Sequence, residues 1–402
     1  MKSIFSPLAS IVVAALAVRT LATGPYGQCG GSGFSGDKNC DAGYACTVVN
    51  EWYHQCLPGA ATTGTPTTTT TSTTTTTATT TTSSAGSSAC PGAVAKFKYF
   101  GVNQSGAEFG DAYIPGTLGK DYTWPSPSSV DYFVNQGFNT FRIAFKLERL
   151  SPLAGGLAGA FDQTYLQGLR TIVEYITRKG AFAVVEPHNY MRYNGNVITD
   201  TTAFGNWWTK LANEFKSNNN VIFDIMNEPN GMDAQVVFNL NQAAVNGIRA
   251  AGATTQLILV EGTSWTGAWT WTSSGNSNAF GAIRDPNNNV AIEMHQYLDS
   301  DGSGTSATCV SGTIGSERLQ AATNWLKQNN LKGFLGEIGA GSNPTCISAV
   351  KGALCSMQTS GVWIGALWWA AGPWWGDYFQ SIEPPNGAAI SQILPQALKP
   401  FM

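Results

Sequence analysis

Charged side chains are scarce in this sequence. Only 12% of the residues are Asp, Glu, Lys or Arg, and the formal net charge is -3. Without a polycationic surface, nucleic acids and anionic membranes are poor candidate partners. Aromatic residues, in contrast, make up 11% of the chain. Because aromatic rings stack on the apolar C–H faces of sugars, this composition favours a carbohydrate ligand.

Long apolar runs are also missing, apart from one near the start of the sequence. Residues 8–18 form a largely apolar run that follows Lys2 and precedes the small residues Thr20 and Ala22. This pattern predicts a secretory signal peptide over residues 1–22, with cleavage after Ala17 as an alternative. The run is too short to span a bilayer. We therefore expect a secreted, extracellular protein whose eight cysteines are mostly oxidised.

Histidines are rare, with three in the chain. They show no pair at metal-ligand spacing, and no Gly-rich phosphate loop follows any expected strand. The sequence therefore predicts neither a metal nor a cofactor.

The composition divides the chain into three zones. Residues 24–58 form a unit too small for a self-sufficient core, so we expect it to depend on disulfides. Its cysteines are Cys29, Cys40, Cys46 and Cys56, whose spacing alone leaves three pairings open. Residues 59–88 are almost entirely Thr, Ser, Ala and Gly, which predicts a disordered linker, either an O-glycosylated stalk or a plain tether.

In the third zone, residues 89–402, β-rich runs alternate with helical patterns. We expect strands at residues 97–103, 140–145, 181–188, 221–228, 256–261, 290–295, 333–337 and 362–369. We expect helices at residues 162–178, 203–216, 234–251, 317–328 and 347–357. Eight such units predict an α/β fold, a (β/α)8 TIM barrel. An open doubly wound sheet is the alternative.

The polar and aromatic residues of this zone cluster where the expected strands end. These residues are Arg142, His188, Asn189, Asn227, Glu228, Glu261, His295, Tyr297, Glu337 and Trp369. In a (β/α)8 barrel such positions converge on one mouth. A structural hydrogen bond would explain any one of them, but core packing does not explain the whole cluster.

Two of these residues, Glu228 and Glu337, are expected at the ends of the fourth and seventh strands. Glycoside hydrolysis requires two carboxyls flanking the scissile bond, about 5–5.5 Å apart in retaining enzymes. Arg142 could keep Glu337 ionised. Asn227 could bond the sugar 2-hydroxyl, a contact that strengthens in the transition state.

Several motifs carry a family resemblance over residues 93–400. Arg142, "NEP" from Asn227, "HN" from His188, "HQY" from His295 and "GE" at Glu337 resemble glycoside hydrolase family 5. Three further motifs resemble fungal endo-β-1,4-glucanases of that family: "GAEFG" at residues 106–110, "GALWWAAGPWWGDY" at 365–378 and "IEPPNG" at 382–387.

The resemblance implies roles for individual residues. It implies that Glu228 is the general acid/base, that Glu337 is the nucleophile and that Trp369 is the platform under the attacked sugar. It also implies a shell of supporting residues around them: Arg142, His188, Asn227, His295 and Tyr297. Trp368 is expected to face elsewhere, because successive strand residues alternate faces.

Other residues are weaker candidates. We expect Glu261 to brace the barrel rim rather than act as a third catalytic acid, and Asn189 to contact substrate. Asn103 begins a glycosylation sequon, but a position in the cleft is the expectation.

The tryptophans outside the predicted strands are candidates for sugar subsites. Trp265, Trp269 and Trp271 lie on the loop after the fifth strand, where one or two, Trp265 first, are expected to bind sugar. Trp374 and Trp375 are either cleft platforms or covers over the last turn.

The four remaining cysteines are assigned to two bridges. Related fungal enzymes bridge the positions of Cys309 and Cys346, and that bridge would join two cleft loops. Cys90 and Cys355 are then left to pair at the barrel bottom.

The small N-terminal unit has a resemblance of its own. "YGQCGGSGFSG" and "NEWYHQC" resemble the fungal family 1 carbohydrate-binding module over residues 26–57. This implies the pairs Cys29–Cys46 and Cys40–Cys56. It also implies a flat cellulose-binding face, made by Tyr26, Trp52, Tyr53, Asn50 and Gln55. Phe34 stands where the family often has Tyr or Trp, so one hydroxyl contact would be missing.

Together these features predict a secreted endo-β-1,4-glucanase that acts by retention and is anchored to cellulose. We expect it to act as a monomer on cellulose and related β-glucans. An endo-β-1,4-mannanase with the same catalytic pair is one alternative. A non-catalytic cellulose-binding or wall-loosening protein is the other.

Overall fold

The computed structural model describes residues 28–30, 38–50, 53–58 and 90–402, and the chain divides into two compact units, residues 1–83 and 84–402. The expected signal peptide at 1–22 and linker at 59–88 lie outside the described residues, so the predicted domain boundaries stay predictions. In the part of the chain that the structure describes, no helix is both long and apolar enough to cross a membrane.

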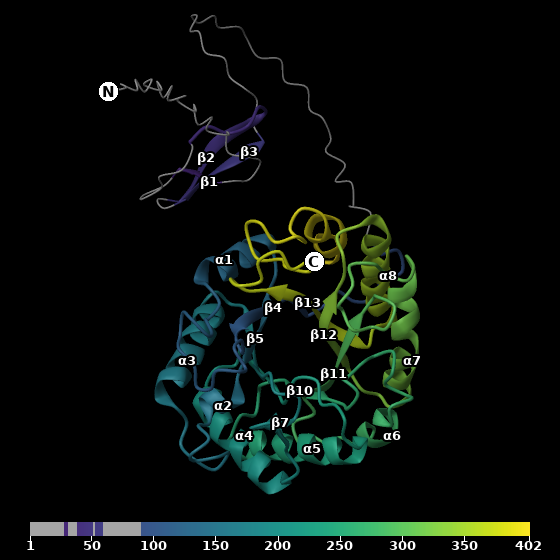
Figure 1. Cartoon of the computed structure of the whole chain (residues 1–402). Helices are drawn as coiled ribbons and strands as arrows, with labels where there is room; N and C mark the ends of the chain where they lie inside the picture. The colour runs from purple at the N-terminus through teal and green to yellow at the C-terminus, as the bar shows by residue number, and fades with distance from the viewer. Residues whose placement is uncertain (1–27, 31–37, 51–52, 59–89) are drawn as a thin grey trace, which may run out of the picture. The chain divides into compact units, whose positions relative to one another are not determined.

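The described part of the N-terminal unit is a three-stranded antiparallel sheet (Figure 1). Its strands are β1 (Gln28–Gly30), β2 (Tyr44–Asn50) and β3 (Tyr53–Pro58), in the order β1-β3-β2. Of the expected cellulose-binding face, Tyr26 and Trp52 lie outside the described residues. For Asn50, Tyr53 and Gln55 the strand backbone is described but not the side chain.

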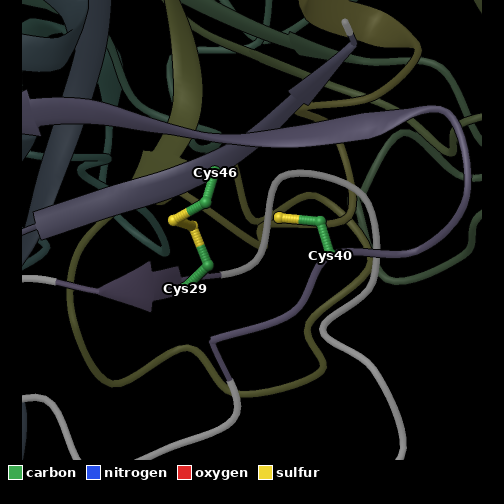
Figure 2. A group of neighbouring side chains, drawn as sticks. All are labelled: Cys29, Cys40 and Cys46. Carbon is green, nitrogen blue, oxygen red and sulfur yellow. A yellow bond between two sulfur atoms is a disulfide. The ribbon is translucent and has the colours of Figure 1, made fainter. Parts of the chain in front are cut away.

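Disulfides hold this small sheet together. Cys29 and Cys46 are bonded to each other, with Cα atoms 5.8 Å apart, and Cys40 lies beside them (Figure 2). Cys40 is also disulfide-bonded. The side chain of its expected partner, Cys56, is not described. Since these sulfurs are oxidised, they are not thiolate ligands for a metal.

The larger unit is a closed barrel of eight parallel strands, in the order β10-β11-β12-β13-β4-β5-β6-β9. Figure 1 looks into this barrel, with the helices around its outside. The strands are β4 (Tyr99–Ala107), β5 (Thr140–Phe145), β6 (Phe182–Pro187), β9 (Val221–Asp224), β10 (Ile258–Glu261), β11 (Val290–Tyr297), β12 (Gly333–Gly339) and β13 (Trp363–Ala371). The predicted (β/α)8 barrel is therefore confirmed.

Five helices follow the predicted patterns closely. They are α3 (Gln163–Arg178), α4 (Thr201–Phe215), α5 (Ala234–Ala250), α7 (Ile314–Gln328) and α8 (Pro344–Ser360). Four of them begin at a side-chain cap that accepts a backbone N–H of the first turn, namely Asp162, Asp200, Asp233 and Asn343.

Several shorter elements were not predicted. They are α1 (Pro127–Gln136), α2 (Leu147–Leu150), α6 (Asn276–Phe280), the hairpin β7 (Arg192–Tyr193) and β8 (Asn196–Val197), and the C-terminal turns η1 (Leu394–Leu398) and η2 (Lys399–Phe401). A signal for α1 was present: Ser126 caps it, Pro127 opens it and Gly137, at φ 100°, ends it.

Inside the barrel, an apolar layer lies next to an acidic one. Val184, Ile222, Leu259 and Ala291 belong to one buried apolar cluster. On the same four strands, two residues further along, stand Glu186, Asp224, Glu261 and Glu293. Because residues two apart on a strand face the same side, these acids point into the barrel interior above the apolar layer. The pleat of the strands thus creates a buried polar layer beneath the barrel mouth.

Two further disulfides stabilise the barrel unit. Cys309–Cys346 joins the loop after β11 to the first turn of α8, and Cys90–Cys355 joins the start of the unit to the same helix. These are the two pairs named from the sequence.

Candidate active site

Arg142, on β5, is the centre of the buried polar layer. Its side chain is fully buried and lies within 3.4 Å of a carboxylate oxygen of five residues. These residues are Glu186, Asp224, Glu261, Glu293 and Glu337. Burial alone would lower the pKa of Arg142, but the surrounding carboxylates raise it well above its ordinary value. The guanidinium is therefore permanently charged and holds this acidic layer together.

Three of these acids, Glu186, Asp224 and Glu293, were missed from the sequence. Each stands as a single acid inside an apolar strand run, which looks like an isolated polar residue. Their shared position could have identified them, because each stands two residues after an apolar residue that faces the barrel interior.

Glu337, on β12, is held by two donors. Arg142 Nη1 donates to its Oε1 at 2.9 Å, and the Tyr297 hydroxyl donates to its Oε2 at 2.5 Å. Both carboxylate oxygens are thus fixed in place, and the side chain is only 4% exposed. The register places Glu337 opposite His295 of β11, after an irregularity between Met294 and His295.

Glu228 is delivered by the segment after β9, not by the strand itself. Its expected position was the strand end, but β9 ends at Asp224. Glu228 has a positive φ of 46°, and its backbone N–H donates to Glu261 Oε2 at 2.7 Å. Glu261 therefore braces the rim, as expected. Its carboxylate fixes the turn that aims Glu228 into the mouth.

The Glu228 carboxyl contacts His295 and lies close to Glu337. Glu228 Oε1 is 2.8 Å from His295 Nδ1. One ligating atom from each of Glu228, His295 and Glu337 lies within 4.8 Å of the others. Burial, and then the negative charge of Glu337, raise the pKa of Glu228 well above its ordinary value. A proton-carrying carboxyl thus faces a carboxylate held by Arg142 and Tyr297.

His188 and Asn227 form one wall of this site. Asn227 Oδ1 accepts from Arg142 Nη2 at 3.0 Å, so its Nδ2 donates to His188 Nε2 at 3.2 Å. His188 Nδ1 then carries the ring proton and donates to Glu186 at 3.3 Å. Burial lowers the pKa of His188, which keeps the ring neutral. The His188 ring stacks on Trp369, with centroids 5.5 Å apart.

A cavity of about 850 Å³ opens on the Glu228 side of the pair. Its lining includes Tyr190, Glu228, Trp265, Trp269, His295 and Tyr297. Trp265 is 56% exposed and Trp269 49% exposed. Trp271, in contrast, is fully buried against Phe280 and Trp325. Two of the three loop tryptophans therefore face the cavity and one packs the core.

Trp368 on β13 and the two tryptophans after that strand divide in the same way. Trp368 is buried and donates its Nε1 to the Gln380 carbonyl, so it faces away from the site. Trp375 packs edge-on against Trp369, with centroids 5.8 Å apart, and Trp374 is 40% exposed.

Two expectations need correction. Asn189 was expected to contact substrate, but it is buried, its Oδ1 accepts from Leu147 N and its Nδ2 donates to Glu148. Its buried amide therefore fastens two loops together instead of lining the cleft. Asn103 was expected in the cleft, yet it lies buried below it and its Oδ1 accepts from Arg142 at 3.0 Å.

Two groups of possible metal donors lie at the site among the described residues: Glu228 with His295 and Glu337, and Glu261 with Glu293 and His295. The shared member, His295, has its Nδ1 against Glu228. Its Nε2 faces carboxylates that already surround Arg142. The Arg142 guanidinium therefore already places a positive charge among these carboxylates.

Comparisons with known proteins agree with this geometry. Residues 99–373 match the family model of cellulase (glycosyl hydrolase family 5), and residues 25–53 match that of the fungal cellulose binding domain. Endoglucanase 3 of Humicola insolens is 52% identical over 380 residues, which cover 94% of this chain and 95% of that protein. Endoglucanase gh5-1 of Neurospora crassa is 52% identical over 385 residues, covering 95% and 97%.

A solved structure supports the same assignment. An endo-beta-1,4-glucanase from Xanthomonas axonopodis pv. citri is 42% identical, with a TM-score of 0.72 over 76% of this chain and all of that one. The family match, the full-length relatives and the paired glutamates in one barrel mouth lead to a single assignment. The chain belongs to glycosyl hydrolase family 5, and it is a cellulose-binding endo-1,4-β-glucanase.

Proposed function

We propose that Glu337 is the nucleophile and Glu228 the general acid/base of a retaining double displacement. In the first step, a Glu337 oxygen bonds to the anomeric carbon while Glu228 gives its proton to the leaving oxygen. In the second step, Glu228 takes a proton from water, which attacks the same carbon and releases Glu337.

The spacing of the two carboxyls carries this proposal. Oxygen atoms of Glu228 and Glu337 lie within 4.8 Å of each other. Inverting enzymes need about 6.5–9.5 Å to admit a water between the carboxyl and the sugar, whereas retaining enzymes need about 5–5.5 Å. The observed spacing favours direct attack by a carboxylate.

The surroundings of each carboxyl support the division of labour. Glu337 accepts hydrogen bonds from Arg142 and Tyr297, which suit an anionic nucleophile. Glu228 has a raised pKa and therefore keeps a proton to donate. Trp369 would form the platform under the attacked sugar, and Asn227 Nδ2 would bond its 2-hydroxyl. Trp265 and Trp269, on the Glu228 side, would hold the leaving sugars.

Azide rescue of alanine variants tests both roles at once. Azide should restore activity to Glu228→Ala and give a β-glycosyl azide, because the covalent intermediate still forms. With Glu337→Ala it should give the α-azide, because azide replaces the missing nucleophile. Glu174→Gln, a change at an exposed α3 position, is the control and should retain full activity. The opposite pair of anomers would reverse the two assignments.

The N-terminal module is proposed to present Tyr26, Trp52 and Tyr53 to cellulose, with Asn50 and Gln55 at their side. The match of residues 25–53 to the cellulose binding domain supports this. Deleting residues 24–58 should abolish retention on crystalline cellulose and leave hydrolysis of soluble cello-oligosaccharides unchanged. Retention that survived the deletion would exclude the module as the anchor.

We also propose that the protein is secreted after removal of residues 1–22 and acts as a monomer. The disulfides in both units support an oxidising compartment. N-terminal sequencing of the mature protein and analytical ultracentrifugation would test these two points.

A further inference from the structure

The buried acid Glu293 has no part in the two-glutamate mechanism, yet it lies next to His295, the residue that contacts Glu228. Glu293 Oε1 is 3.7 Å from His295 Nε2, on the opposite side of the imidazole from Glu228. The backbone of β12 makes room for it: a Cβ on Gly336 would lie 1.6 Å from the same oxygen. Glycine at 336 therefore permits a carboxyl group beside the nucleophile strand.

Glu293 differs from the other acids around Arg142 in having no N–H or hydroxyl donor. Neither of its oxygens accepts a hydrogen bond from the described residues, although both are buried. Arg142 Nε lies 3.3 Å away, but its only hydrogen is directed to Asp224 at 2.7 Å. A buried carboxylate without donors is costly, whereas a protonated carboxyl is not.

The other acids have their donors. Glu261 is 3.8 Å from His295 Nε2, but Arg142 and the Glu228 backbone N–H occupy its two oxygens. Glu186 has His188 and Arg142. Among the acids behind His295, Glu293 is thus the one placed to hold a proton. Burial, and then the charge of Asp224, raise the pKa of Glu293 well above its ordinary value.

On the side that faces Glu293, His295 has a ring nitrogen without a hydrogen-bond partner among the described residues. Its Nδ1 is occupied by Glu228, and its buried Nε2 has no hydrogen-bond partner among the described residues. Burial and then Arg142 lower the pKa of His295 well below its ordinary value, so the resting ring is neutral. A neutral ring with Nδ1 protonated presents a lone pair at Nε2 toward Glu293.

We propose that Glu293 is a buried proton store, which lends its proton to His295 Nε2 while Glu228 is deprotonated. This rests on the proposed roles of Glu228 and Glu337. In the first step the Glu228 proton passes to the leaving oxygen, Glu337 becomes an ester, and the Glu293 O–H bond breaks as an N–H bond forms at Nε2. In the second step water protonates Glu228, the ester is cleaved, and the Nε2 proton returns to Glu293.

Charge balance favours this movement. The first step transfers the negative charge from Glu337 to Glu228, so Arg142 loses one anionic partner while His295 gains one. A proton that moves from Glu293 to His295 places an imidazolium against Glu228 and a carboxylate 3.3 Å from Arg142 Nε. The transfer needs the two side chains to close by about 0.8 Å, to normal hydrogen-bond length. Glu293 is therefore a positioning residue, since it acts through His295 and does not touch substrate.

The leaving group distinguishes this role from simple support of the fold. Proton donation by Glu228 is needed for an alkoxide leaving group, as in cellotetraose, but not for dinitrophenolate. Glu293→Gln should therefore lower kcat/KM on cellotetraose about 10-fold, a part of the usual effect of general acid catalysis. On dinitrophenyl β-cellobioside it should stay within about twofold of wild type. Equal losses on both substrates, or no loss on either, would overturn the proposal.

Two further variants separate this proposal from the proposed function. Glu228→Gln should show the same selectivity at larger amplitude. If Glu228→Gln is selective for cellotetraose and Glu293→Gln is not, the proton-store proposal fails and the acid/base assignment stands. If Glu228→Gln is not selective, both proposals fail. Glu186→Gln, which touches Arg142 and His188 but not His295, is the matched control and should affect both substrates alike.

A measurement on the unaltered enzyme covers the case in which Glu293→Gln does not fold. The value of kcat/KM on cellotetraose is measured across mixtures of light and heavy water. Two protons in motion give a curved dependence on the deuterium fraction, which the proposal requires. A straight line indicates one proton and would overturn it.

Discussion

Tyr297 donates a 2.5 Å hydrogen bond to Oε2 of Glu337, and Arg142 fixes the other oxygen of the same carboxylate. A carboxylate held at both oxygens has little freedom to rotate, so its orientation is fixed before substrate binds. Pre-organisation of this kind is most valuable where a bond must form in one direction.

Tyr297→Phe removes one of the two donors without creating a cavity. A hydrogen bond to a charged group contributes about 1.5–3 kcal/mol, so we expect kcat/KM on soluble cellulose to fall roughly 10- to 100-fold. The melting temperature should change little. Steady-state kinetics together with thermal unfolding measure both, and an unchanged rate would show that Arg142 alone orients Glu337.

Arg142→Met should destabilise the barrel by about 3–5 kcal/mol at neutral pH, because it leaves buried carboxylates without their cation. Burial already raises the pKa values of Glu186, Glu261 and Glu293, and without Arg142 they rise further above their unfolded values. Stability is then present at low pH and lost as pH rises. Urea unfolding at several pH values should show the deficit growing with pH. Arg170→Met breaks a partly exposed pair with Glu214 and should cost less than about 1 kcal/mol.

Glu108 should make the stability of the enzyme depend on pH. Burial raises the pKa of Glu108 from 4.5 to about 7. Since the folded value is the higher one, this contribution is fully present below about 4.5 and is lost as pH rises to about 7, a change of about 3 kcal/mol. Glu108→Gln should remove that slope from the free energy of unfolding. A slope identical to wild type would show that Glu108 does not titrate in this range.

Trp265→Ala should weaken binding of sugars on the leaving-group side. The ring lines the cavity beside Glu228 and is 56% exposed, so its loss removes a stacking surface without disturbing the core. We expect KM for cellopentaose to rise several-fold at a nearly constant kcat, with little effect on dinitrophenyl cellobioside. Tyr113→Ala, an exposed aromatic that does not line this cavity, is the control.

Much of this architecture could be read from local patterns. Apolar runs and capped helices repeat regularly, so all eight barrel strands and five of the helices were predicted. Because side chains alternate between the two faces of a strand, Trp368 was expected to face away from the site, and it does. The fourth strand was less regular, because the chain leaves it after Asp224 and a turn held by Glu261 carries Glu228.

By itself, the sequence determined the barrel, the two glutamates and their Arg142 neighbour, because each belongs to a local motif or a regular period. Only the tertiary structure decided which isolated acidic residues of the strands meet around Arg142. Glu186, Asp224 and Glu293 are 38 to 107 residues apart along the chain, and they meet because closure of the barrel brings their strands around one guanidinium. It also decided that Asn189 bonds to Glu148 instead of facing sugar. Such contacts depend on register and loop path, which no local pattern encodes.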